Sequence, residues 1–254
     1  MNILSIGNSF SQDAHRYLHR IAKADGYEMN TFNLYIGGCP LSKHYRNMLS
    51  GEKAYELEMN GESTGFFVSL KDALLNRNWD VVTIQQASTE SPYYKNYQPY
   101  LQKLVDYIRE CVPHTKIAFH QTWAYQEDSK LLNIRLGYKH HEDMFAGIKQ
   151  SWQKAVEETG ADILIPSGET FEEMLKNGIE KIHRDTYHAS YKLGRYTLGL
   201  LWYRVLTGND ITNNTFSDFD EVTDLFYDFS ENVTDREIKI AKESILKTCE
   251  MYGV

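Results

Sequence analysis

Short apolar runs that alternate with longer amphipathic segments constrain the fold of this chain more than any other feature of its sequence. Each run has the length and composition that are typical of a buried strand in a parallel sheet. The intervening segments place apolar residues three or four positions apart, as helices packed on a sheet do. We expect strands over residues 3–6, 31–36, 81–84, 116–119 and 162–165, and helices over residues 13–24, 100–111, 142–159, 170–177, 191–206 and 235–251.

The alternation predicts an α/β fold, a three-layer α/β/α sandwich around a central parallel five-stranded sheet. Residues 1–254 are expected to form a single domain, because a chain of 254 residues with 42% hydrophobic content can bury one full core. An Asn60-Gly61 pair between two aromatic-bearing stretches predicts a hairpin or loop insertion near residues 50–68.

Charge and composition exclude several classes of partner. The net charge of -8 argues against nucleic acid, since phosphate binding needs clustered Lys and Arg. The three cysteines are scattered and indicate free thiols. No apolar run approaches the roughly 18 to 20 residues that cross a bilayer, so no membrane segment is expected. No signal peptide precedes the first strand, which predicts a cytoplasmic protein as the sequence stands. A leader removed from its start would make the protein periplasmic or secreted.

A small polar cluster follows the first expected strand. Gly7 ends that strand, and Asn8, Ser9 and Ser11 precede the first helix. A residue in this turn lies at the carboxyl edge of the sheet, where open α/β folds bind their ligands. Ser9 is therefore a candidate nucleophile, while the same three residues are also typical of a helix cap.

A second cluster lies ahead of the helix expected over 191–206. Asp185 and His188 are three residues apart, so one turn can present both side chains to the same point. A nucleophilic serine needs a histidine base, and that base needs an acidic partner. On its own, an Asp-x-x-His pair is equally compatible with a surface loop and a helix cap.

In this order, the motifs resemble the SGNH/GDSL hydrolase superfamily. Gly7-Asn8-Ser9 ends the first strand, a glycine pair follows the second, a polar amide follows the third, and Asp185-x-x-His188 comes near the end. The sequence looks most like a bacterial branch that is similar to carbohydrate acetylesterases with a glutamine in the oxyanion hole. The resemblance implies a flavodoxin-like sandwich and a serine esterase.

The resemblance also assigns roles to single residues. Ser9 becomes the nucleophile, His188 the general base and later acid, and Asp185 the residue that orients His188. Asn8 stands where the family normally has an aspartate that is not the triad acid. Among the glycines, the backbone N–H of Gly38 is the expected oxyanion donor next to that of Ser9, and Gly37 is the near alternative.

The third block departs from the family pattern. Most members have an asparagine that donates to the oxyanion, whereas this chain has Gln85-Gln86. The glutamine-using acetylesterases make Gln86 the expected third donor. Strand alternation says only that Gln85 and Gln86 face opposite ways, so which of them faces the site stays open.

Two further motifs resemble functional sites but lack the sequence context that such sites need. Gly61-Glu62-Ser63-Thr64-Gly65 matches the nucleophile elbow of α/β-hydrolases, but it lies in a polar turn without the required strand before the serine. His140-His141-Glu142-Asp143 is dense in possible ligands, yet adjacent residues on a helix diverge, and a solvated helix start explains the run. We expect neither a metal nor a cofactor.

Aromatic residues suggest the substrate. Trp123 and Tyr125 follow the fourth strand on the side of the expected site, and their faces and hydroxyls suit a sugar ring, although each could equally pack a helix onto the sheet. We expect hydrolysis of a small acyl ester, acetyl above all, on a carbohydrate. The alternative is a catalytically silent binding module for a carbohydrate or similar ligand, favoured only by the altered third block.

Overall fold

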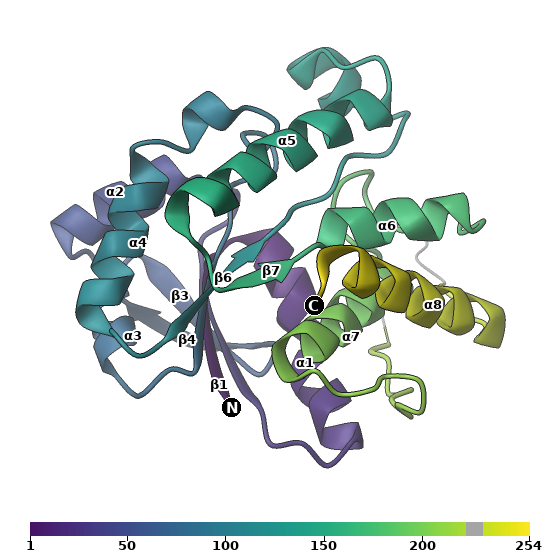
Figure 1. Cartoon of the computed structure of the whole chain (residues 1–254), viewed down its shortest axis with the longest axis horizontal. Helices are drawn as coiled ribbons and strands as arrows, with labels where there is room; N and C mark the ends of the chain where they lie inside the picture. The colour runs from purple at the N-terminus through teal and green to yellow at the C-terminus, as the bar shows by residue number, and fades with distance from the viewer. Residues whose placement is uncertain (222–230) are drawn as a thin grey trace.

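The computed structural model describes residues 1–221 and 231–254, which form a mixed sheet flanked by helices on both faces (Figure 1). The strands are β1 (Asn2–Gly7), β2 (Asn30–Tyr35), β3 (Tyr55–Met59), β4 (Glu62–Val68), β5 (Val81–Ile84), β6 (Lys116–His120) and β7 (Ile163–Ile165). The helices are α1 (Ser9–Ala24), α2 (Leu41–Ser50), α3 (Leu70–Leu75), α4 (Tyr100–Cys111), α5 (His141–Thr159), α6 (Ser167–Lys176), α7 (Leu193–Thr207) and α8 (Asp235–Tyr252). Two short helical turns, η1 (Tyr94–Asn96) and the π-helical η2 (Leu131–Leu136), lie in loops.

The sheet corrects the predicted strand number. Its order is β4-β3-β2-β1-β5-β6-β7, and the five strands expected from the sequence are the parallel block from β2 to β7. The expected hairpin adds two antiparallel strands, β3 and β4, to the edge at β2. Asn60 and Gly61 join these strands with φ angles of 52° and 84°, the left-handed conformations that a two-residue hairpin turn needs. The sheet is therefore seven-stranded and mixed.

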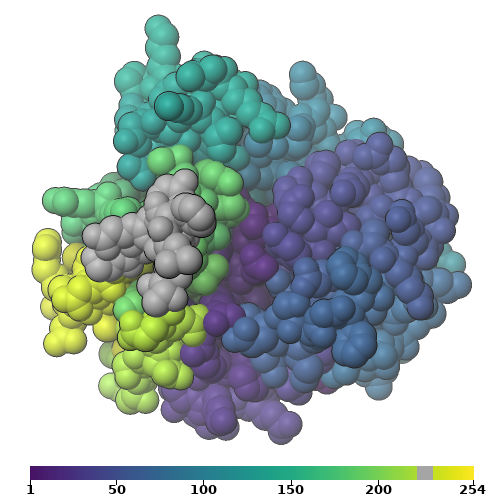
Figure 2. Space-filling view, turned by 180° about the vertical axis from the view of Figure 1, so that it is seen from behind, coloured from purple at the N-terminus to yellow at the C-terminus, as the bar shows by residue number. Residues whose placement is uncertain are grey.

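Two apolar layers hold the helices on the sheet. Ile3 on one face of β1 belongs to the core with α1, α7 and α8, whereas Leu4 on the other face belongs to the core with α2, α3 and α4. Figure 2 shows the N-terminal residues in purple between the blue segments and the green and yellow segments of the C-terminal part. This packing sets the first turn of α1 beside the chain that leads into α7.

Helices α2 and α3 were not expected from the sequence. The buried face of α2 carries His44 and Asn47 along with Leu41, so its apolar periodicity is weak. Helix α1 begins at Ser9, four residues before the expected start, because its first turn is polar and capped. In the described part of the chain, no helix has the length and apolarity that a bilayer span requires.

Candidate active site

The structure brings Ser9 next to His188, which follows it by 179 residues in the sequence, and His188 next to Asp185. His188 Nε2 lies 2.8 Å from Ser9 Oγ, and His188 Nδ1 lies 2.7 Å from Asp185 Oδ2. The backbone N–H of His188 also donates to Asp185 Oδ1 over 2.8 Å. This chain of contacts is the arrangement in which a histidine can accept a proton from a serine while a carboxylate fixes its orientation.

The Ser9 turn satisfies both interpretations of its sequence. Asn8 is the N-cap of α1, where its side chain accepts from Phe10 N and exchanges hydrogen bonds with Ser11 in a capping box. Ser9 is then the first helical residue, and its N–H belongs to the turn in which a helix offers no acceptor. The cap therefore holds the serine hydroxyl toward His188 and leaves its N–H available to an anion.

Asp185 is held in its ionised form. Burial by itself raises the pKa of this half-buried carboxyl, but the hydrogen bonds from the side chain and backbone of His188 outweigh burial and lower the pKa to about 2. Asp185 is therefore a carboxylate at every pH at which a histidine titrates.

A buried ion cluster, which the sequence analysis missed, joins the Ser9 helix to the His188 loop. Asp13 of α1 is fully buried and accepts from Arg184 over 2.8 Å and from Arg195 over 2.8 Å. Its Oδ2 also accepts from the backbone of Ala189. The sequence did contain a signal for this cluster, because Asp13 lies four residues before Tyr17 and so on the apolar face of the first helix. Because Asp13 contacts both sides of the turn, it fixes the position of His188 relative to Ser9.

The loop between Asp185 and His188 has a strained backbone, and two of its carbonyls accept hydrogen bonds from residues 123 and 126. Thr186 has a φ of 73°, which is rare for a β-branched residue and typical of strain at functional sites. Gln126 N donates to its carbonyl over 2.8 Å. Trp123 Nε1 donates to the carbonyl of Tyr187 over 2.8 Å.

Trp123 was predicted to contact the substrate, but in the structure it supports this loop instead. It is 1% exposed and stacks on Phe10 with ring centroids 4.0 Å apart. Phe10 lines the space in front of Ser9, whereas Trp123 does not. Tyr125 does line that space, although it is also only 1% exposed, and its hydroxyl lies 2.8 Å from Ser88 Oγ.

Both glycines of the second block line the space in front of Ser9. Gly38 has a φ of 59°, a conformation that favours glycine, while the φ of Gly37 needs no glycine. Asn8 Nδ2 donates to the carbonyl of Cys39 over 3.2 Å and so ties this turn to the Ser9 turn. Gly38 and Ser9 therefore lie on a common wall.

Neither glutamine of the third block is placed as an oxyanion donor. Gln86 Nε2 donates to the carbonyl of Asn96 over 2.9 Å, and Gln86 Oε1 accepts from Leu41 N over 3.0 Å. Gln85 Nε2 donates to Asn8 Oδ1 over 2.8 Å. The expectation for Gln86 is corrected because both ends of its amide are bound by the turns around the site. The two glutamines position those turns.

A cavity of about 330 Å³, here called the triad cavity, lies in front of Ser9 and His188. The loop after β5 presents Ser88 and Thr89 to it, just past the two glutamines of the third block. Six other lining residues were not expected from the sequence, and their only signal was their place at the carboxyl edge of the sheet. These are Phe10, Tyr35, Ala87, Leu131, Arg135 and Tyr187.

The elbow-like serine lies elsewhere. Ser63 is on the edge strand β4, where its hydroxyl donates to Glu56 of the neighbouring strand β3. Helix α3 begins only after Ser69, so no helix follows Ser63 directly. Ser63 is a surface residue without a histidine partner among the described residues, as the polar context of the motif indicated.

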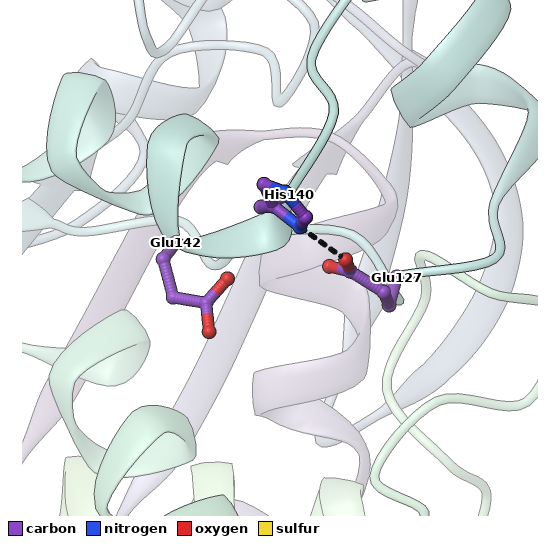
Figure 3. A group of neighbouring side chains, drawn as sticks. All are labelled: Glu127, His140 and Glu142. Atoms are coloured by element: carbon purple, nitrogen blue, oxygen red, sulfur yellow. Dashed lines mark hydrogen bonds and ion pairs between the residues drawn. The ribbon is translucent and has the colours of Figure 1, made fainter.

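One side-chain group within residues 1–221 and 231–254 could hold a metal ion. Glu127, His140 and Glu142 bring one ligand atom each within 4.8 Å of the others, and all three are exposed (Figure 3). Glu127 already accepts from His140 Nδ1 over 2.7 Å and from the backbone of His141 over 2.7 Å. These bonds join the loop after β6 to the start of α5, so a structural role accounts for the group without a metal.

Comparisons with known proteins identify a family and a fold. The family model described as "Domain of unknown function (DUF4886)" matches residues 2–233. A crystal structure of a DUF4886 family protein from Bacteroides uniformis is 31% identical with a TM-score of 0.87, over 100% of this chain and 95% of that one. A search of curated proteins found no match.

More distant structures share the fold. A proposed SGNH hydrolase from Slackia heliotrinireducens is 21% identical with a TM-score of 0.59, over 81% of this chain and 98% of that one. An acetylxylan esterase from Geobacillus stearothermophilus is 13% identical with a TM-score of 0.53, over 81% of this chain and 91% of that one. The chain therefore belongs to the DUF4886 family and is structurally similar to SGNH/GDSL hydrolases and acetylxylan esterases.

Proposed function

We propose that this protein is a serine esterase that removes a small acyl group, acetyl above all, from a carbohydrate ester. The observation that carries the proposal is the hydrogen bond of 2.8 Å between Ser9 Oγ and His188 Nε2, continued to Asp185 over 2.7 Å. A serine that only capped a helix would not need a histidine whose other nitrogen contacts a carboxylate.

The chemistry follows from these contacts. His188 takes the proton from Ser9 as Ser9 Oγ attacks the ester carbonyl, and Asp185 stabilises the imidazolium that forms. The backbone N–H groups of Ser9 and Gly38 stabilise the negative charge on the carbonyl oxygen. His188 then gives the proton to the leaving alcohol. In the second half of the reaction, His188 takes a proton from a water molecule that attacks the acyl group on Ser9, and returns it to Ser9 Oγ as the acid leaves.

The lining of the triad cavity supports a small acyl group on a sugar. The half-buried Tyr35 and Tyr187 border it together with the buried Tyr125, and tyrosine rings with their hydroxyls suit a sugar face and its polar edge. The cavity volume of about 330 Å³ lies at the small end of ligand pockets. The fold relatives described as acetylxylan esterases have the corresponding activity.

A silent binding module is the second candidate, favoured by one observation. Gln86, expected to supply a side-chain donor to the oxyanion, is bound elsewhere. A missing donor typically costs about 2.7 to 4 kcal/mol of transition-state stabilisation, which slows an esterase without abolishing it. The hydroxyls of Ser88 and Thr89 on the cavity wall are the replacements we propose.

Hydrolysis of 4-nitrophenyl acetate tests the proposal. Wild-type protein should release nitrophenol, and Ser9→Ala should lower the rate to about the uncatalysed level, because the nucleophile is gone. Ser63→Ala is the matched control, since it removes the decoy serine and should keep the wild-type rate. Equal rates for the wild type and Ser9→Ala would leave Ser9 as a helix cap and favour the binding module.

A further inference from the structure

A second cavity of about 350 Å³ adjoins the triad cavity. Thr89 and Arg135 line both, so the two cavities share one wall. The second cavity is also lined by Tyr93, Lys95 and Asn96. A ligand whose ester lies at Ser9 can therefore extend past Arg135 into this adjacent space.

The adjacent cavity is cationic on an acidic protein. Lys95 and Arg135 line it together with one acid, Glu90, whose carboxylate accepts from the side chain of Asn96. Within residues 1–221 and 231–254, no ion pair joins Lys95 or Arg135 to a carboxylate. With a net charge of -8, the chain has an excess of acids that could have paired these cations. Two cations without acidic partners at a cavity mouth form a ready anion site.

The segment that carries Arg135 is anchored at both ends. Arg135 lies in the π-helical turn η2, and such turns occur frequently at functional sites. Before it, Glu127 binds His140 and the start of α5 (Figure 3), and Asn133 Nδ2 donates to the carbonyl of Glu127 over 3.0 Å. After it, the rings of Tyr138 and Tyr93 stack 6.3 Å apart. The anchored turn holds Arg135 between the two cavities at a lower entropic cost than a free loop would.

We propose that the substrate is anionic: a sugar ester whose carboxylate or phosphate binds Arg135, with Lys95 nearby, while its acyl group lies at Ser9. This inference rests on the proposed esterase function and names its substrate class. An arginine guanidinium matches the planar, two-oxygen geometry of a carboxylate and also binds phosphate. A neutral acetylated sugar would leave both cations without an anionic partner, Lys95 keeping only its contact with the Tyr93 ring.

Three matched substrates test the proposal: acetylated methyl glucoside, the corresponding acetylated methyl glucuronoside, and the acetylated 6-phosphate. Acetate release gives kcat/KM for each. We expect the wild type to prefer an anionic sugar over the neutral one by about 10-fold, the effect of one charge-assisted hydrogen bond. Whether the carboxylate or the phosphate is faster identifies the anion.

Two variants test whether Arg135 causes the preference for anionic sugars. Arg135→Ala should bring the anionic-to-neutral ratio of kcat/KM to about 1, and Lys139→Ala, a neighbouring exposed lysine outside both cavities, should keep the wild-type ratio. Hydrolysis of all three sugars at similar rates would overturn the anion site and leave the esterase intact. An enzyme that cleaves neither these sugars nor 4-nitrophenyl acetate would instead contradict the proposed function itself.

Discussion

The two walls of the triad cavity use polar residues in different ways. On one wall, Ser9 and His188 line the cavity and contact each other, while Asp185 binds the other nitrogen of His188. On the other, Ala87, Ser88 and Thr89 line the cavity, and the preceding Gln85 and Gln86 direct their amides into the protein, where they hold the turns that carry Asn8 and Leu41. The comparison teaches that a polar residue at the right place in a motif can serve either the reaction or the loop that supports it.

Asp185→Asn should slow turnover more than any change to the glutamines. The asparagine keeps the shape of the side chain but cannot stabilise the imidazolium or hold the required tautomer of His188, so kcat on 4-nitrophenyl acetate should fall about 10⁴-fold. Steady-state kinetics checks this. Asp13→Asn gives a comparison at a carboxylate with a structural role, because it leaves Arg184 and Arg195 without their buried partner. It should lower the free energy of unfolding in urea by about 3 to 5 kcal/mol. If Asp185→Asn keeps more than a tenth of the activity, His188 is not working with Asp185.

The pH profile should have one acid limb. A protonated imidazole cannot accept the Ser9 proton, so the rate should fall by up to about tenfold per unit as the pH drops through the range of about 5 to 8 in which histidine titrates. Asp185 cannot cause this limb, because its lowered pKa of about 2 means that it loses its charge, and the contact with His188, only far below that range. Burial lowers the pKa of His15, His44 and His120 to about 3, which excludes them as well.

His114→Ala, at an exposed histidine far along the chain from the triad, controls for general charge effects and should leave the limb unchanged. A rate that is flat from about pH 5 to 8, with the protein folded throughout by circular dichroism, would rule out histidine as the base.

The glutamines should show the smallest effect on turnover. Gln86→Ala removes the hydrogen-bond partner of Leu41 N and of the Asn96 carbonyl. Gln85→Ala removes the hydrogen-bond donor to Asn8 Oδ1. Each substitution should therefore lower the free energy of unfolding by about 1 to 3 kcal/mol. We expect kcat to fall less than about tenfold in both variants, because neither amide contacts the oxyanion. Urea unfolding and ester kinetics on the same samples separate the two effects. A loss in kcat of about 10²-fold or more with unchanged stability in Gln86→Ala would restore Gln86 as a direct donor.

The sequence predicted the parallel part of the sheet because strand and helix periodicities there are strong. It could not predict that the hairpin at 50–68 joins the sheet, since pairing at an edge depends on tertiary contacts and not on local pattern. Helix α2 was missed because buried His44 and Asn47 disguise its apolar face. In each case the missing information lay in what a residue packs against.

The same limit applies to the site. Ser9, Asp185 and His188 were predictable because short motifs hold them at fixed places in the fold. Gln86 and Trp123 were assigned to the cavity from their positions after strands, but the hydrogen bonds of Gln86 and the stacking of Trp123 on Phe10 direct both away from it. Arg135 lies in a loop whose path no sequence pattern specifies.

Labelling with a fluorophosphonate probe, followed by peptide mass spectrometry, shows whether Ser9 is a nucleophile, because the probe modifies only an activated serine. We expect a single adduct on the peptide that contains Ser9, absent from Ser9→Ala and formed much more slowly in His188→Ala. The Ser63 peptide should stay unmodified. A folded protein that takes up no probe, or that is labelled at another serine and not at Ser9, would mean that Ser9 is not the nucleophile.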